Sequence, residues 1–243
     1  MEKAYKLLAL QEGFSNNKAK ELIDKGVVYI ENKKVEVARA EYSDKTKFNI
    51  LDVEEIKVIF EDEYLIAVNK PPFYNSEELT KKFKGTTLLH RLDRETSGVI
   101  ILTKDEDFRT KAIREFINNN VYKEYVAIVN GKVMEEFEIN DPIMTIKKGG
   151  AKSVISHKGK PALTRVYPLE IHGKKSKVKV VIDTGRTHQI RVHLSAHDFP
   201  ILGDTLYGIK SSAKRVMLHS KKIQLFDYEF EAPEPAVFSK IFG

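Results

Sequence analysis

The sequence of 243 residues contains no cysteine, which removes several kinds of chemistry at once. A chain without cysteine has no disulfide, no thiolate nucleophile and no cysteine-ligated zinc or iron–sulfur cluster. It also has no apolar run of the roughly 18 residues that cross a bilayer, and its N-terminus lacks the apolar stretch of a secretory signal. We therefore expect a cytoplasmic protein without a membrane partner.

Two further motifs of known chemistry are missing. There is no glycine-rich phosphate loop, which argues against a nucleotide-binding parallel fold. Histidines at 188, 193 and 197 fall on an expected helix, but the glutamate of a zinc-protease motif is absent. We expect no bound metal ion.

Positive charge is in modest excess and unevenly distributed. The formal net charge is +6, which suits an acidic partner. Between Pro142 and Ile182, ten Lys and Arg residues accompany a single acid, Glu170. Such a block suits phosphates, and it equally suits a solvated hairpin that carries lysines for solubility. The ten are Lys147, Lys148, Lys152, Lys158, Lys160, Arg165, Lys174, Lys175, Lys177 and Lys179.

Residues 1–52 have the pattern of a small α/β module. Apolar spacing predicts a helix over 4–10, and Ser15 begins a second helix that Gly26 ends. A short strand and a turn at Asn32 follow. Ten Lys and Arg against nine Asp and Glu leave the module almost without net charge.

Strand patterns dominate after the first fifty residues. Helices are expected over 105–116 and 187–196. Because the strands do not alternate regularly with helices, we predict an α+β fold whose sheet is mixed and mainly antiparallel. The boundary falls near residues 52–55, which gives two domains, 1–52 and 53–243. Strands are expected over 56–60, 64–68, 99–102, 122–129, 164–171, 177–182 and 216–230.

The most informative stretch is His-Arg-Leu-Asp-Arg-Glu-Thr-Ser-Gly, residues 90–98, directly before an apolar strand. Thr96, Ser97 and Gly98 can bond or bend the backbone, so the turn can aim Asp93 away from the sheet. Neighbouring arginines would keep that carboxylate ionised. On spacing alone, a turn cap or one half of an ordinary ion pair is the favoured interpretation of Asp93.

These nine residues resemble the central motif of the RluA-type pseudouridine synthases, which modify RNA. Two departures bear on substrate choice: Phe73 stands where the family usually has glycine, and the segment 74–87 is short. The resemblance continues through residues 61–72, 123–127, 185–194, 200–204 and 207–208.

The resemblance implies a cofactor-free isomerisation of uridine to pseudouridine. It assigns Asp93 as the group that attacks the ribose or removes a sugar proton, and the sequence does not choose between these routes. It places an arginine against this carboxylate, for which we predict Arg186, with Arg191 as the alternative.

Four other residues are assigned to RNA by the same resemblance, and Arg191 is counted as a further RNA contact. Tyr125 would stack on the uracil, although a strand tyrosine usually faces the core. Lys123 would contact a phosphate or the base. Arg91 would hold open the gap left by a flipped uridine, unless it pairs with a neighbouring acid. Ile190 would face the base, or belong to the core.

The N-terminal module resembles an RNA-binding module shared with a ribosomal small-subunit protein. This resemblance makes Lys18, Lys20 and Lys25 candidate RNA contacts, while the near-zero module charge leaves a packing role open.

The leading hypothesis is an RNA uridine isomerase that acts as a monomer on large-subunit ribosomal RNA. A tRNA-directed synthase is the nearest rival. A non-catalytic RNA-binding or ribosome-assembly protein is a further alternative. A carboxylate-dependent glycoside hydrolase would need a second acid, for which Glu95 has no supporting motif.

Overall fold

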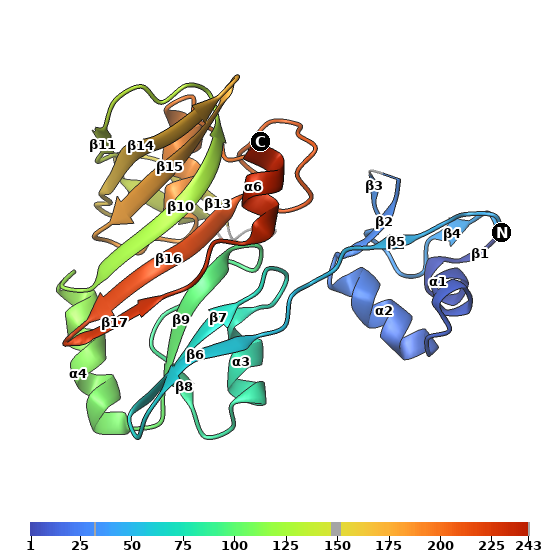
Figure 1. Cartoon of the computed structure of the whole chain (residues 1–243), viewed down its shortest axis with the longest axis horizontal. Coiled ribbons are helices and arrows are strands. Elements are labelled where there is room, and N and C mark those ends of the chain that lie inside the picture. The colour runs from blue at the N-terminus through green and yellow to red at the C-terminus, as the bar shows by residue number, and fades with distance from the viewer. Residues whose placement is uncertain (32, 147–151, 243) are drawn as a thin grey trace. The chain divides into compact units, whose positions relative to one another are not determined.

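The computed structural model describes residues 1–31, 33–146 and 152–242. The chain divides into two compact units, Met1–Glu55 and Ile56–Gly243, which are considered separately (Figure 1). The expected turn at Asn32 and the block lysines Lys147 and Lys148 lie outside the described residues. Within the described ranges, no helix is long and apolar enough to span a membrane.

The N-terminal unit packs two helices against short strands. The hydroxyl of Ser15 accepts the backbone N–H of Lys18 and so caps α2. Gly13 ends α1 in the left-handed conformation that glycine adopts without strain. The elements are β1 (Glu2–Lys3), α1 (Ala4–Glu12), α2 (Asn16–Asp24), β2 (Val28–Ile30), β3 (Lys33–Lys34), β4 (Glu41–Tyr42) and β5 (Asn49–Ile50).

The larger unit is built on one ten-stranded sheet whose main path runs β11-β14-β15-β10-β16-β9-β7-β6. Only the β9–β16 pairing is parallel among the described ladders, so the predicted mixed, mainly antiparallel sheet is confirmed. Its strands are β6 (Lys57–Glu61), β7 (Leu65–Lys70), β8 (Thr87–Leu88), β9 (Ser97–Thr103), β10 (Tyr122–Asn130), β11 (Phe137–Ile139), β14 (Thr164–His172), β15 (Lys175–Ile182), β16 (Leu218–Leu225) and β17 (Tyr228–Glu231).

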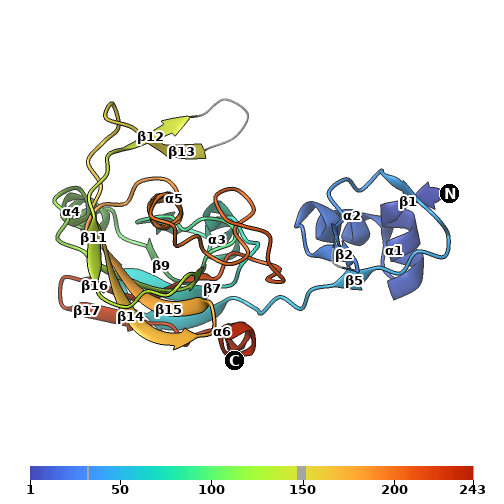
Figure 2. The same cartoon turned by 90° about the horizontal axis from the view of Figure 1, so that it is seen from above.

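Helices cover both faces of this sheet. Figure 2 shows α3 (Ser76–Lys82) and α5 (Gln189–Ala196) on one side of the strands and α6 (Ala236–Phe242) on the other. Along β9, Ile100 and Leu102 join one buried cluster, while Val99 and Ile101 join a second. The second cluster includes Ala112 of α4 (Glu106–Ile117). A separate hairpin, β12 (Ile143–Ile146) and β13 (Lys152–Ile155), projects beyond α5 in the same view.

The long strand expected over 216–230 is instead a hairpin. β16 and β17 pair antiparallel around Phe226 and Asp227, and Phe226 has a positive φ of 53°. The turn contains no glycine, proline or asparagine, so Asp227 is its single turn-forming residue. The last predicted helix also begins two residues later, at Gln189 rather than Thr187.

Gly98 is required by a close backbone approach. It is the second residue of β9 and has a φ of 113°, opposite Ser220 of β16 in the parallel ladder. A Cβ at this position would collide with the Ser220 carbonyl. The last residue of the central motif therefore allows β9 and β16 to pair directly beside Asp93.

Candidate active site

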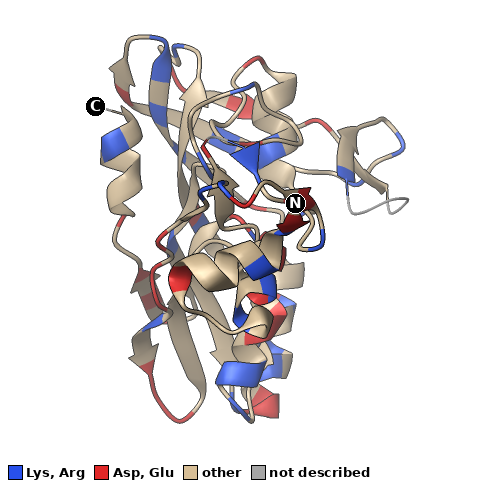
Figure 3. Cartoon of the chain, turned by 90° about the vertical axis from the view of Figure 1, so that its right-hand side faces the viewer, with Lys and Arg blue, Asp and Glu red and all other residues tan. Residues whose placement is uncertain are grey.

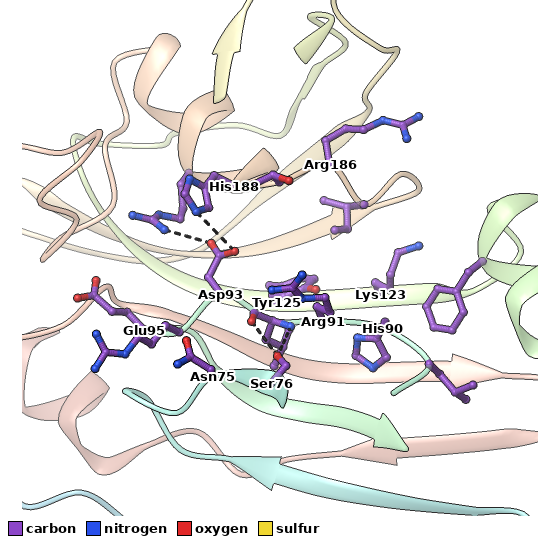
Figure 4. Close-up of a pocket in the computed structure, with 18 of the residues that line it drawn as sticks. Asn75, Ser76, His90, Arg91, Asp93, Glu95, Lys123, Tyr125, Arg186 and His188 are labelled. Atoms are coloured by element: carbon purple, nitrogen blue, oxygen red, sulfur yellow. Dashed lines mark hydrogen bonds and ion pairs between the residues drawn. The ribbon is translucent and has the colours of Figure 1, made fainter. Parts of the chain in front are cut away.

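Asp93 lies in the loop between β8 and β9, and this loop is held from α3. The hydroxyl of Ser76 donates to the Leu92 carbonyl at 2.9 Å and accepts the Leu92 N–H at 3.0 Å. The backbone carbonyl of the next residue, Asp93, accepts the Thr96 N–H at 3.1 Å in a tight turn. These bonds fix the backbone on both sides of the carboxylate, which projects into the cleft of Figure 4.

A buried lysine supports the same loop from behind. Lys70 is fully buried, and its ammonium donates to the carbonyls of Tyr74 at 2.9 Å, Pro71 at 3.1 Å and Arg94 at 3.3 Å. Burial lowers the pKa of Lys70 to about 7. The sequence predicts no role for Lys70 beyond its place in a matched block, because no pattern indicates that a lysine is buried.

Arg191, and not Arg186, pairs with Asp93, which corrects the prediction. Its Nη1 lies 3.1 Å from Oδ2 of Asp93, while Nε and Nη2 grip Asp204 at 2.7 and 2.9 Å. Arg186 precedes α5 and its Nε donates to the Pro161 carbonyl at 3.0 Å. The helix begins at Gln189, whose side-chain oxygen accepts the Arg186 N–H, so Arg191 is the arginine carried inward on the helix.

Asp204 makes this arrangement rigid. Its side chain is fully buried, and its Oδ1 also accepts the backbone N–H groups of Leu206 and Tyr207. These bonds and the Arg191 guanidinium hold the pKa of Asp204 below its usual value in spite of burial. Sequence reasoning missed Asp204, although an acid in a matched block could have indicated a buried arginine partner.

His188 also faces Asp93, from the opposite side to the sheet. Its Nε2 lies 3.9 Å from Oδ1 of Asp93, and its Nδ1 lies 2.9 Å from the Tyr207 hydroxyl (Figure 4). Burial lowers the pKa of His188 below the usual imidazole value, although Asp93 acts in the other direction. Neither His188 nor Tyr207 was assigned a role from the sequence.

Tyr125 and Ile190 form buried walls of the same cleft. Both are at most 7% exposed, and both line its inner part together with Asp93. The β10–β16 register shifts between Glu124 and Tyr125, an irregularity of the kind that re-aims side chains beside functional sites. Burial and the nearby Asp93 charge raise the pKa of Tyr125, so its hydroxyl stays protonated.

Lys123 and Arg91 line the outer part of the cleft in very different settings. Lys123 is buried, donates to the Asp183 carbonyl at 2.8 Å, and has its pKa lowered to about 8 by burial. Arg91 is exposed and pairs with Glu77 of α3 at 2.8 Å. It therefore pairs with neither of the neighbouring acids considered from the sequence.

The cleft that these residues enclose has a volume of about 940 Å³ and a basic lining. That size exceeds what one nucleotide needs and suits a segment of a larger ligand. Its cationic residues are Arg91, Arg94, Lys123, Arg186 and Arg191, and its acids are Glu77, Asp93 and Glu95.

Two members of the lysine block are paired with acids. Arg165 bridges Glu138 and Asp183, and Lys177 pairs with Glu170 and Glu234. In the view of Figure 3, Lys and Arg are interspersed with Asp and Glu. Part of the block is thus engaged in pairing within the larger unit.

The candidate lysines of the N-terminal unit are also partly engaged. Lys18 pairs with Glu21 at 3.0 Å, and the ammonium of Lys20 lies 4.4 Å from the centre of the Tyr5 ring. Lys25, which ends α2, is partly buried. In the described part of the chain, no group of three or more metal-ligating side chains comes together.

Comparison with known proteins identifies the family. Residues 63–196, more than half of the chain, match the RNA pseudouridylate synthase family. The chain belongs to this family. It is 55% identical over 240 residues to an uncharacterized RNA pseudouridine synthase of Helicobacter pylori strain J99, which covers 98% of this chain and 99% of that one.

Further members show what the similarity covers. Ribosomal large subunit pseudouridine synthase D of Borreliella burgdorferi is 33% identical over 198 residues, 70% of this chain and 61% of that one. The structure of human RNA pseudouridylate synthase domain containing 1 matches with a TM-score of 0.67 and 28% identity, over 75% of this chain and 84% of that one. The α+β pseudouridine synthase fold and an isomerase activity on RNA follow from family membership.

Proposed function

We propose that this pseudouridine synthase isomerises uridines of large-subunit ribosomal RNA, with Asp93 as its reactive group. The observation that carries the proposal is the placement of Asp93. Its backbone is fixed by Ser76 and Lys70, and its Oδ2 is held by a buried arginine. A carboxylate fixed in this way at the inner end of a basic cleft is ready to act on a bound sugar.

The chemistry follows from the positions of the cleft residues. The reaction breaks the bond between ribose C1′ and uracil N1 and forms a bond from C1′ to C5, with no redox change. An ionised Asp93 can attack C1′ or remove a sugar proton, and the Arg191 guanidinium lies against its Oδ2. Tyr125 and Ile190 offer apolar surface on which a detached uracil can be held while it turns.

A structured RNA substrate requires the target base to leave its stack, which costs a few kcal/mol. Arg91 is placed to compensate for this loss, since its exposed guanidinium lies at the cleft opening and can stack on bases and meet phosphates. Lys123 and Arg186, on the same lining, would contact the backbone of the flipped strand.

Support for ribosomal RNA comes from relatives and from the N-terminal unit. The synthases of Borreliella burgdorferi and of Vibrio parahaemolyticus, the latter 29% identical over 70% of this chain, are named for the ribosomal large subunit. Residues 1–52, with Lys18, Lys20 and Lys25, would add a second RNA contact. A tRNA target is the alternative.

Tritium release from RNA labelled at uridine C5 tests the proposal. We expect the wild type to release tritium from large-subunit rRNA transcripts, and Asp93→Asn to release none, because the amide lacks the charge and the nucleophilic oxygen. Equal release by both would reject Asp93. Release from tRNA transcripts alone would replace the rRNA assignment with the tRNA one.

A further inference from the structure

The two oxygens of the Asp93 carboxylate are in different environments. Oδ2 accepts from Arg191 at 3.1 Å. Oδ1 has no hydrogen bond within the described part of the chain, and Nε2 of His188 lies 3.9 Å from it. Oδ1 is therefore the oxygen available for a substrate, and His188 is the residue that faces it.

The hydrogen bonds of Tyr207 determine which imidazole nitrogen carries the proton. The Tyr207 oxygen accepts the backbone N–H of Ser153 at 2.7 Å, so the hydroxyl hydrogen must point to another acceptor. Nδ1 of His188 lies 2.9 Å away. Donation of the hydroxyl hydrogen to Nδ1 would leave the neutral imidazole with its hydrogen on Nε2, facing Oδ1 of Asp93.

The backbone of His188 is arranged for this contact rather than for the helix. His188 precedes α5 at the N-cap position, but its side chain makes no capping hydrogen bond. It also has a φ of 53° and a ψ of 23°, a left-handed conformation that is uncommon for a residue other than glycine. Such strain persists only where surrounding contacts determine it, as those of His188 with Tyr207 and Asp93 do.

We propose that His188 is a positioning residue for the reaction, held by Tyr207 as the Nε2–H tautomer so that a neutral N–H donor orients Oδ1 of Asp93. The inference rests on the proposed role of Asp93. Arg191 and His188 would then hold one carboxylate oxygen each, the first by an ion pair and the second by a weaker contact that a substrate can displace.

Protonation of His188 would change this arrangement. The charged groups that face its imidazole are Asp93 from the β8–β9 loop, Arg191 from α5 and Asp204, with the Tyr207 hydroxyl against Nδ1. An imidazolium would form a true ion pair with Oδ1 and lose the bond from the Tyr207 hydroxyl, because both of its nitrogens then carry hydrogen. Turnover would fall as His188 takes up a proton.

His188→Asn is the principal variant because asparagine tolerates the left-handed backbone and is a good N-cap residue. Its shorter side chain does not reach Asp93. We expect kcat to fall about 10- to 100-fold because Oδ1 loses the polar group that faces it, with KM changed less than about 3-fold. The wild type should lose activity on the acid side of its pH profile as His188 protonates, and His188→Asn should lack that limb.

A double-mutant cycle separates positioning from a purely structural role of Tyr207. Tyr207→Phe alone should lower kcat by about 3- to 10-fold, because the tautomer is no longer fixed. In the His188→Asn background the same change should cost nothing further. Equal costs in both backgrounds, or a His188→Asn enzyme with wild-type kcat, would overturn the proposal.

The tautomer itself is measured without substrate, by long-range ¹H–¹⁵N NMR of the full chain labelled at histidine. The resonance pair that disappears in His188→Asn should show a hydrogen on Nε2 and none on Nδ1, and Tyr207→Phe should shift it toward a mixture. The opposite tautomer would reject the inference. Because Asp93→Asn is assayed in parallel, failure of the Asp93 or rRNA assignment is distinguished from failure at His188.

Discussion

Arg191 and Arg91 line the same cleft, but the protein holds them in opposite ways. The side chain of Arg191 is 8% exposed, and it donates to Asp204 through two nitrogens while a third donates to Asp93. The side chain of Arg91 is 72% exposed and has one ion pair, with Glu77. A buried bidentate pair fixes geometry, whereas an exposed pair exchanges readily with a new anion. The first therefore suits a positioning role and the second suits RNA contact.

Removing Arg191, the buried arginine of the two, should have the largest effect on stability and activity. Arg191→Ala leaves the Asp204 carboxylate buried without its partner, which should lower the free energy of unfolding by about 3–5 kcal/mol. Activity should be lost even in molecules that remain folded, because Asp93 loses its cation. Urea unfolding and tritium release measure the two effects.

Arg109→Ala is the matched control, since Arg109 makes an exposed pair with Glu106 and does not line the cleft. It should change neither quantity appreciably. If Arg186→Ala abolished turnover while Arg191→Ala did not, the original assignment of Arg186 would be restored in place of Arg191.

Lys70 sharpens the comparison because it is a buried cation with carbonyl partners instead of a carboxylate. Its pKa of about 7 is below the ordinary lysine value of 10.5, which the unfolded chain retains. Between these two pH values the unfolded state binds the extra proton, so the free energy of unfolding should rise with pH by up to about 1.4 kcal/mol per unit from this group.

Lys70→Met removes that titration. The difference in the free energy of unfolding between wild type and variant, measured by urea unfolding at several pH values, should therefore grow from pH 7 to 10. A difference independent of pH would show that Lys70 titrates normally. Since the Asp93 loop also loses the hydrogen bond from Lys70 to the Arg94 carbonyl, the variant should be less active at every pH.

Arg91→Ala tests the exposed side and should have the smallest effect on the fold. The free energy of unfolding should stay within about 0.5 kcal/mol of wild type. The affinity for an rRNA transcript should fall. The slope of log Kd against log salt concentration should decrease by about 1, which corresponds to the loss of one phosphate contact. An unchanged salt dependence would remove Arg91 from the RNA interface.

The sequence located Asp93 because its whole motif is local and continuous. It did not identify the arginine partner, because Arg186 and Arg191 lie in one block and the choice depends on where α5 begins. A helix that began at Thr187 would orient the two arginines differently from the observed helix, which begins at Gln189. Boundaries of this kind are set by side-chain bonds, such as Gln189 to the Arg186 N–H, that no periodicity reveals.

Roles that depend on burial were equally hidden. Lys70 and Asp204 both stand in matched blocks, yet lysine and aspartate are mostly surface residues. The hairpin at Phe226 was missed for a related reason, since a bulky residue in the left-handed region is a poor turn signal. The sheet class, in contrast, followed from strand content and order, which are spread over many residues.

The position of β16 in the sheet has a consequence for how the enzyme is made. β16 lies between β10, which carries Tyr125, and β9, which follows the Asp93 loop, and Ser220 stands opposite both Tyr125 and Gly98. A chain that ends before β16 contains Asp93, Tyr125 and Arg191 but lacks the strand that joins β10 to β9. We expect such a truncated chain to hold Tyr125 and Asp93 on no common scaffold, and therefore to be inactive.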